Sequence, residues 1–153
     1  MSKAFTREDE EGAENLPDRP ISSYRNLVTA EGLAEIEANL RRLREEEIAA
    51  QGDGDTAALA RVARDQRYWH ARLQSAELVT PPGDTNEVRF GSTVTVRRSD
   101  GTERTWRIVG EDEADPARGT LSHASPVAQA LLGGRAGEVV EAGPGEWEIL
   151  EIS

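Results

Sequence analysis

Two stretches of apolar residues recur at alternating spacings of three and four, one on each side of a short segment that contains glycine. The first stretch follows Thr29, a good helix N-cap, and its seam positions are Leu33, Ile36, Leu40 and Leu43. The second stretch has Leu59, Val62, Gln66, Trp69, Leu73 and Ala76 at the equivalent positions. Such spacing is typical of a coiled coil, so we predict one helix over about 30–50 and another over about 57–78.

The segment between the two stretches, residues 51–56, has the composition of a chain reversal. Its sequence Gln-Gly-Asp-Gly-Asp-Thr combines two glycines with short polar side chains, which favour turns. The two predicted helices have similar lengths, as an antiparallel pair requires. We therefore predict a helical hairpin over residues 28–80, with its tip at 51–56.

The residues that flank the hairpin have a different character. Residues 1–27 contain the acidic run Glu8–Glu11 and few apolar side chains, which is typical of a flexible arm. Residues 81–86 begin with two prolines and a glycine, which end the second helix and form a linker.

Strand-like runs follow the linker and occupy residues 87–153. The runs at 93–96 and 105–109 flank Asp100-Gly101, a pair that suits a tight hairpin, and two more runs lie at 138–140 and 147–152. Between them, Ser125–Gly133 has the serine cap, early proline and final glycine of a short helix. We predict a four- or five-stranded antiparallel sheet covered by one helix, which makes the whole chain α+β.

The charge and the absence of cysteine exclude several classes of protein. The net charge of −11 opposes indiscriminate binding to nucleic acid phosphates and anionic lipids, and it favours a protein partner. A chain without cysteine has no disulfides, thiolate zinc sites or cysteine nucleophiles, which indicates a reducing cytoplasm. No stretch approaches the ~20 apolar residues of a membrane span. We expect a cytoplasmic protein that binds neither membranes nor specific DNA sequences.

Several ordered pieces of the chain resemble the C-terminal domain of the GreA and GreB transcription elongation factors. These pieces are Phe90–Val94, Ile108–Asp115, Leu121–Ser122, Ser125–Gly133 and Gly137–Val140. The resemblance continues into the hairpin, where Thr29–Gly32 opens the first helix as in that family and Gly52–Asp53 falls at the tip. It covers roughly Val28 to Ile152 and leaves the N-terminal arm outside it.

The resemblance implies both a fold and a partner. It implies an FKBP-like C-terminal domain that binds the rim of the RNA polymerase secondary channel and a coiled coil that enters the channel. The rim contacts that it implies are His123, Ala124, Ser125 and Pro126. Ala124 stands where the family often has a polar or acidic residue, so the rim contact is expected to differ in detail. The serine and proline also suit a helix cap, and the two roles are compatible.

The residues at the hairpin tip bear on whether the protein stimulates transcript cleavage. Cleavage-stimulating members of the family present acidic side chains there, which help the polymerase hold a second magnesium ion. Asp53 and Asp55 are the candidate magnesium ligands of this chain, and the Glu-Asn pair of the family pattern is missing. The same aspartates suit a turn and a helix cap. Each predicted helix is shorter than its family counterpart by about a heptad, which withdraws the tip by roughly 10 to 15 Å.

We therefore predict a Gre-like regulator of transcription elongation that binds RNA polymerase at the secondary channel without strong stimulation of transcript cleavage. It would be a regulatory binding protein rather than an enzyme, and it would need no cofactor of its own. The alternatives are a cleavage factor that uses the tip aspartates and an Rnk-like regulator of nucleoside diphosphate kinase. A peptidyl-prolyl isomerase on the FKBP-like fold is disfavoured, because the domain has only Phe90, Trp106 and Trp147 to line an aromatic pocket.

Other chemistry-bearing residues give weaker patterns. Arg61, Arg64 and Arg67 lie three residues apart on the predicted second helix, so they share one face that meets either backtracked RNA or solvent. His70 and His123 are the only histidines and lack ligands at metal spacing. Neither a zinc site nor a catalytic dyad is predicted from them.

Overall fold

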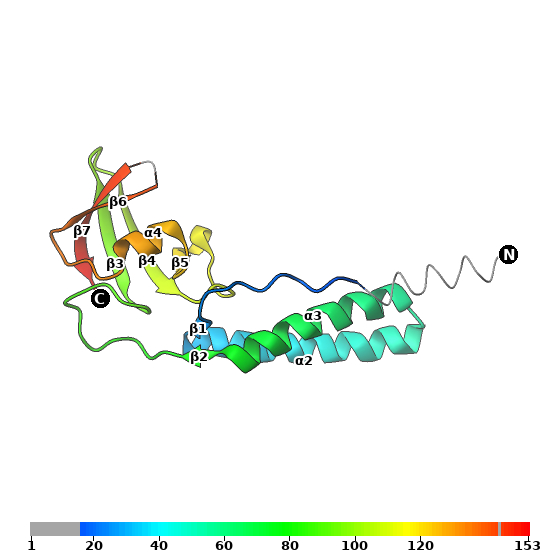
Figure 1. Cartoon of the computed structure of the whole chain (residues 1–153). Coiled ribbons are helices and arrows are strands. Elements are labelled where there is room, and N and C mark those ends of the chain that lie inside the picture. The colour runs from blue at the N-terminus through cyan, green and yellow to red at the C-terminus, as the bar shows by residue number, and fades with distance from the viewer. Residues whose placement is uncertain (1–15, 144) are drawn as a thin grey trace. The chain divides into compact units, whose positions relative to one another are not determined.

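The computed structural model describes residues 16–143 and 145–153 (Figure 1). The described chain divides into two compact units. The hairpin unit comprises residues 16–23 and 34–75, and the sheet unit comprises residues 24–33 and 76–153. Residues 1–15 of the arm that was expected to be flexible lie outside the described residues.

Two long helices, α2 (Ala30–Asp53) and α3 (Thr56–Ser75), form the hairpin. Ile36, Leu43 and Ala50 of α2 are buried at intervals of seven residues, and Val62 of α3 is buried as well. A heptad interval returns a side chain to the same face, so the seam predicted for the first helix is the one that packs. In α3 the buried residues are Ala60, Val62 and Arg72, and only Val62 belongs to the predicted seam. No helix in the described part of the chain is long and apolar enough to cross a membrane.

The ends of the helices differ from the predicted ends. Helix α2 continues to Asp53, so the chain reverses over Gly54 and Asp55 alone, with Gly54 at φ 63°. The predicted end of the second helix near Leu78 is wrong, because α3 stops at Ser75. The residues that follow form β2 (Glu77–Leu78), which pairs in parallel with β1 (Leu27–Val28). This pairing joins residues fifty positions apart, which helical periodicity cannot reveal.

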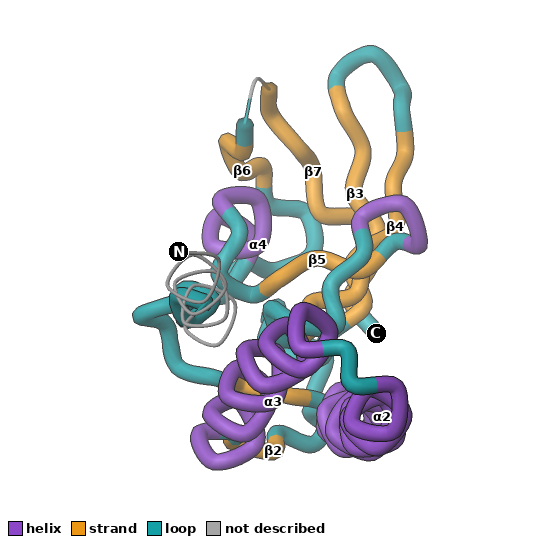
Figure 2. The backbone as a smooth tube through the Cα atoms, turned by 90° about the vertical axis from the view of Figure 1, so that its right-hand side faces the viewer, coloured by secondary structure: helices purple, strands orange, loops and turns teal. Residues whose placement is uncertain are grey.

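The C-terminal sheet has five strands in the order β5-β4-β3-β7-β6. The strands are β3 (Thr93–Arg98), β4 (Glu103–Val109), β5 (Thr120–Ser122), β6 (Val139–Ala142) and β7 (Gly145–Ile152). Figure 2 shows them side by side, with α4 (Pro126–Leu131) near β6. The pairing is antiparallel except that β5 runs parallel to β4, so the prediction of a purely antiparallel sheet is wrong at this edge. The rest of the predicted α+β fold, a helical hairpin followed by a mostly antiparallel sheet with one short helix, is confirmed.

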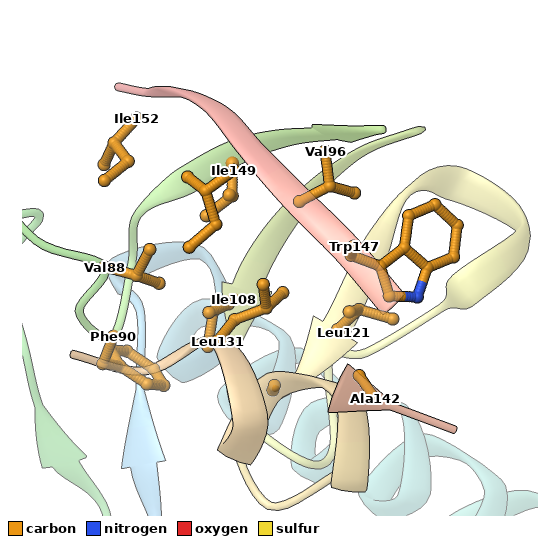
Figure 3. Packing of buried hydrophobic residues seen from close by; sticks show 12 residues of the cluster. Val88, Phe90, Val96, Ile108, Leu121, Leu131, Ala142, Trp147, Ile149 and Ile152 are labelled. Carbon is orange, nitrogen blue, oxygen red and sulfur yellow. The ribbon is translucent and has the colours of Figure 1, made fainter. Parts of the chain in front are cut away.

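A single apolar cluster holds the sheet and α4 together. Val94 and Val96 of β3 point into it, whereas the alternate residues Thr93 and Thr95 are half-exposed, as the period of a strand requires. Leu131 of α4 is fully buried against the same cluster. Figure 3 shows the side chains of this cluster converging between the sheet and α4.

An ion pair beside the β1–β2 pairing gives the first testable prediction. Arg25 donates to the carboxylate of Glu77 at 2.7 and 3.2 Å, and these hydrogen bonds lower the pKa of Glu77 below its ordinary value of 4.5. Because the pKa is lower in the folded state, the pair stabilises the fold above the unfolded-state pKa and ceases to do so as the pH falls through the folded-state pKa.

We expect Glu77→Gln to reduce the acid dependence of stability below about pH 4.5, because the variant keeps one acceptor oxygen at this position but loses the titrating charge. The measurement is the melting temperature of both proteins as a function of pH. Since both side chains are substantially exposed, the effect should be small. Identical pH profiles would contradict the assignment.

Candidate functional site

The hairpin tip brings the two predicted magnesium ligands to the end of the helix pair. Asp53 is the last residue of α2, and Asp55 directly precedes α3. Both line a groove of about 360 Å³ between the two helices. Four carboxylates face this groove, from Glu46, Asp53, Asp55 and Asp65.

Three of these four carboxylates already have partners inside the hairpin unit. Asp55 accepts a hydrogen bond from the backbone N–H of Ala58 at 3.1 Å, which is the geometry of an N-cap. Ion pairs occupy the other two, Glu46 with Arg42 at 2.8 Å and Asp65 with Arg19 and Arg64 at 3.4 and 3.5 Å. Within the described residues, no group of three or more His, Cys, Asp or Glu side chains is arranged to hold a metal ion.

The cap at Asp55 gives a second prediction. We expect Asp55→Ala to destabilise the hairpin by about 1 kcal/mol, because the first turn of α3 loses its side-chain acceptor. Asp55→Asn should retain nearly full stability, since asparagine caps helices as well as aspartate does. The measurement is thermal unfolding followed by far-UV circular dichroism. Equal losses in the two variants would argue against a capping role.

The three arginines of α3 have different surroundings. Arg61 is exposed at the tip groove, and Arg64 makes its ion pair along the helix. Arg67 donates to the Asp18 carboxylate at 2.6 Å and to the Leu16 carbonyl at 3.1 Å. Arg67, one of the three arginines predicted to face either RNA or solvent, is thus in contact with the chain's own N-terminal segment.

The loop between β5 and α4 contains the four residues to which the resemblance assigned the rim contact. Hydrogen bonds fix its backbone. The N–H of His123 donates to the Val109 carbonyl at 2.9 Å, and the N–H of Ser125 donates to the Ser122 carbonyl at 3.0 Å. The N–H of Ala124 donates to the Ser122 hydroxyl at 3.1 Å. The backbone donors of this loop are therefore satisfied within the sheet unit, which fixes its conformation.

The start of α4 completes the same loop. The Ser125 hydroxyl accepts a hydrogen bond from the N–H of Ala128 at 3.3 Å, so the serine cap and the proline that follows it are present as predicted. Pro126 is exposed, and Ala124 and Ser125 are half-exposed. These three residues form the accessible part of the loop.

His123 is different from its three neighbours, because its side chain is only 6% exposed. Its ring packs edge-on against Phe90 at 5.5 Å and against Tyr24 at 6.5 Å between centroids. Its carbonyl oxygen accepts a hydrogen bond from the Gln129 side chain at 2.7 Å. The imidazole is therefore buried beneath the loop and packs against its interior side. Only the other three residues are accessible to a partner.

Glu113 is a structural anchor in the sheet unit that sequence reasoning missed. Its carboxylate accepts hydrogen bonds from the Thr29 N–H at 3.0 Å, from the Thr29 hydroxyl and from the Gly110 N–H at 3.2 Å. The Thr29 hydroxyl in turn accepts a hydrogen bond from the N–H of Gly32 at 3.0 Å. Glu113 thus anchors the first turn of α2 to the turn after β4, across 84 positions of sequence.

Gly32 explains why this anchor fits. A Cβ atom on Gly32 would lie 2.0 Å from a Glu113 carboxylate oxygen, which is far inside van der Waals contact. The only sequence signal was the Thr29–Gly32 opening of the helix, where a glycine in the first turn has no reason in helix propensity. The glycine leaves space for a carboxylate that comes from a distant turn.

This architecture defines a class of protein with a helical hairpin and a small sheet domain, and comparison with known proteins places it in a family. Residues 83–153 match the family model for the C-terminal domain of the transcription elongation factors GreA/GreB. The transcription elongation factor GreA of Chloroflexus aggregans is 37% identical and aligns with 71% of this chain and 82% of its own length. GreA of Rhodospirillum rubrum is 34% identical, with 82% and 94% covered. The chain belongs to the GreA/GreB family of transcription elongation factors.

A solved structure of the same family is also similar. The GreA factor homolog 1 (Gfh1) of Thermus thermophilus is 21% identical, and the match covers 85% of this chain and 99% of that protein with a TM-score of 0.42.

Proposed function

We propose that this chain binds RNA polymerase at its secondary channel, with the loop at Ala124–Pro126 on the channel rim and the hairpin in the channel. There it regulates elongation with little stimulation of transcript cleavage. Membership of the GreA/GreB family supports the polymerase as partner. The observation that supports weak stimulation of cleavage comes from the groove at the hairpin tip, where three of the four carboxylates already have partners within the hairpin unit.

The lengths of the helices support the same proposal. Helix α2 has 24 residues and α3 has 20, which corresponds to about 36 and 30 Å at 1.5 Å per residue. The alignment with the Chloroflexus aggregans protein has 128 positions. It includes 71% of the 153 residues of this chain, which is about 109 residues. About 19 positions of that relative therefore have no counterpart in this chain. We place these positions in the hairpin, as the resemblance to the family implies. A hairpin shortened in this way would hold its tip away from the catalytic magnesium, and carboxylates bind such ions only within ~2.5 Å.

The loop at Ala124–Pro126 supports the rim contact. Its backbone is held by hydrogen bonds and its exposed part consists of three small uncharged residues, which suits a defined contact with a protein surface. Because Ala124 brings no charge to this position, the contact should depend on shape more than on ionic strength.

Competition on core polymerase tests the site and the partner together. We expect the full chain to displace a fluorescently labelled authentic GreA from core polymerase, as measured by fluorescence anisotropy. Ala124→Trp should weaken that competition at least tenfold, because its side chain would separate the loop from the rim. Ala117→Trp is the matched control, since Ala117 is exposed in the short 3-10 helix Pro116–Arg118 outside the loop. Failure of the unmodified chain to compete would refute the proposal.

A cleavage assay on backtracked elongation complexes tests the second part. We expect transcript cleavage close to the level of the polymerase alone, and no further decrease in Asp53→Asn. Robust cleavage that is lost in Asp53→Asn would instead establish the alternative of a cleavage factor that uses the tip. Asp55→Asn is the informative partner variant, because it keeps the helix cap while removing a charge that magnesium would need.

A further inference from the structure

Residues 16–23, which we name the N-terminal strap, lie along helix α3 in the hairpin unit (Figure 1). The Arg19 guanidinium stacks on the ring of Tyr68 at 4.0 Å and lies 5.9 Å from that of Trp69. It also forms the ion pair with Asp65 at 3.4 Å. Together with the two hydrogen bonds from Arg67 to the strap, these contacts cover one face of α3.

The strap has a conformation suited to this position. Pro17 and Pro20 fix φ near −65° and lack an N–H donor, so the segment favours an extended backbone and leaves fewer donors to satisfy. Preorganisation of this kind reduces the conformational entropy that docking removes.

The attachment of the strap is nevertheless weak. None of its residues is buried: Leu16 and Arg19 are half-exposed and the others are exposed. The side chains of Arg67 and Asp18 remain 45% and 73% exposed although they pair. Exposed ion pairs and cation–π contacts each change an equilibrium constant only a few-fold. Contacts of this strength would let the strap exchange between a docked and a released state.

We infer that the strap is an autoinhibitory cover, which must leave α3 before the hairpin can enter the polymerase channel. This inference rests on the proposed function. The docked strap adds a second layer of chain to a hairpin that has to fit a channel. Its Asp18 also forms an ion pair with Arg67, next to Tyr68 and Trp69 in the sequence of α3.

A reversible crosslink tests the cover directly. The chain has no cysteine, so Asp18→Cys/Arg67→Cys introduces the only two thiols. A reducible bifunctional thiol reagent then ties the strap to α3, and a reductant opens the same molecule. The apparent Kd equals the intrinsic Kd divided by the open fraction, so we expect the linked form to bind core polymerase about tenfold more weakly than the reduced form, or not at all.

A second linked pair controls for the reagent. Arg42→Cys/Glu46→Cys on α2 replaces an exposed ion pair away from the strap, and its affinity should not change on reduction. If the linked and reduced strap variants bind equally, the strap is no cover, and the proposed function stands. If no form of the protein binds polymerase, including the unmodified chain, the proposed function fails and the inference fails with it.

Limited proteolysis with endoproteinase Asp-N, which cleaves on the N-terminal side of aspartate, tests the strap without polymerase. Cleavage before Asp18, followed by mass spectrometry, should be slow in the unmodified chain, because Arg67 binds the Asp18 carboxylate and the Leu16 carbonyl, and faster by several-fold in Arg67→Ala, which removes both hydrogen bonds. Equal cleavage rates would show that the strap does not dock and would overturn the inference.

Discussion

Gly32→Ala is expected to lower the stability of the sheet unit by about 2–4 kcal/mol, although alanine is the better helix former. The new Cβ atom would lie 2.0 Å from the Glu113 carboxylate, so that side chain has to move away. Its movement breaks the hydrogen bonds to Thr29 and leaves the Thr29 N–H at the start of α2 without its acceptor. Hydrogen bonds to charged groups contribute about 1.5–3 kcal/mol each, which exceeds the gain of up to about 1 kcal/mol in helix propensity.

The same substitution elsewhere on α2 provides the matched control. A Cβ atom on Gly52 would meet nothing within 4 Å, so Gly52→Ala should stabilise the helix by about 0.5–1 kcal/mol. The measurement is denaturant unfolding, combined with hydrogen exchange of the first turn of α2. Glu113→Ala should reproduce most of the loss seen in Gly32→Ala, and the double variant should add little. Stabilisation by both glycine substitutions would contradict the anchor.

Leu131→Ala is expected to cost about 2–5 kcal/mol, which is the largest loss predicted for a single side chain. Leu131 is completely buried and packs, together with Ala128 of the same helix, into the cluster that includes Ile108 and Ile149. Truncation leaves a cavity under a helix of six residues that has few other buried side chains. Because α4 begins at Pro126, the loop proposed to meet the polymerase should also become more mobile.

Leu132→Ala is the control for this prediction, because the neighbouring leucine is only half-buried at the edge of the same cluster. We expect its loss of stability to be less than half of that in Leu131→Ala. Unfolding is followed by tryptophan fluorescence, since Trp106 and Trp147 lie in the sheet unit. Similar losses in the two variants would mean that α4 does not depend on Leu131 for its packing.

Local patterns predicted the parts of the fold that local interactions determine. The heptad seam, the Asp100-Gly101 hairpin and the capped helix after Ser125 all depend on residues within a few positions of one another. The pairing of β1 with β2 and the short parallel strand β5 were missed, because each depends on a partner segment that no periodicity identifies.

The candidate sites divide in the same way. The composition of residues 51–56 alone indicated that Asp55 suits a turn and a helix cap, and the structure shows that cap. The burial of His123, the anchor at Glu113 and the docking of Asp18 on Arg67 bring together residues that are distant in sequence. Hydrophobic pattern and capping rules do not encode such contacts between polar side chains.

The seven-residue interval between Ile36, Leu43 and Ala50 also bears on how this hairpin can evolve. The first turn of α2 is fixed by contacts inside the sheet unit, whereas the opposite end closes with a turn of two residues. Removal or insertion of one heptad in each helix near that turn would keep the same faces in register and leave the anchored end untouched. The length of the hairpin can therefore change in steps of about 10 Å without changes in the sheet unit.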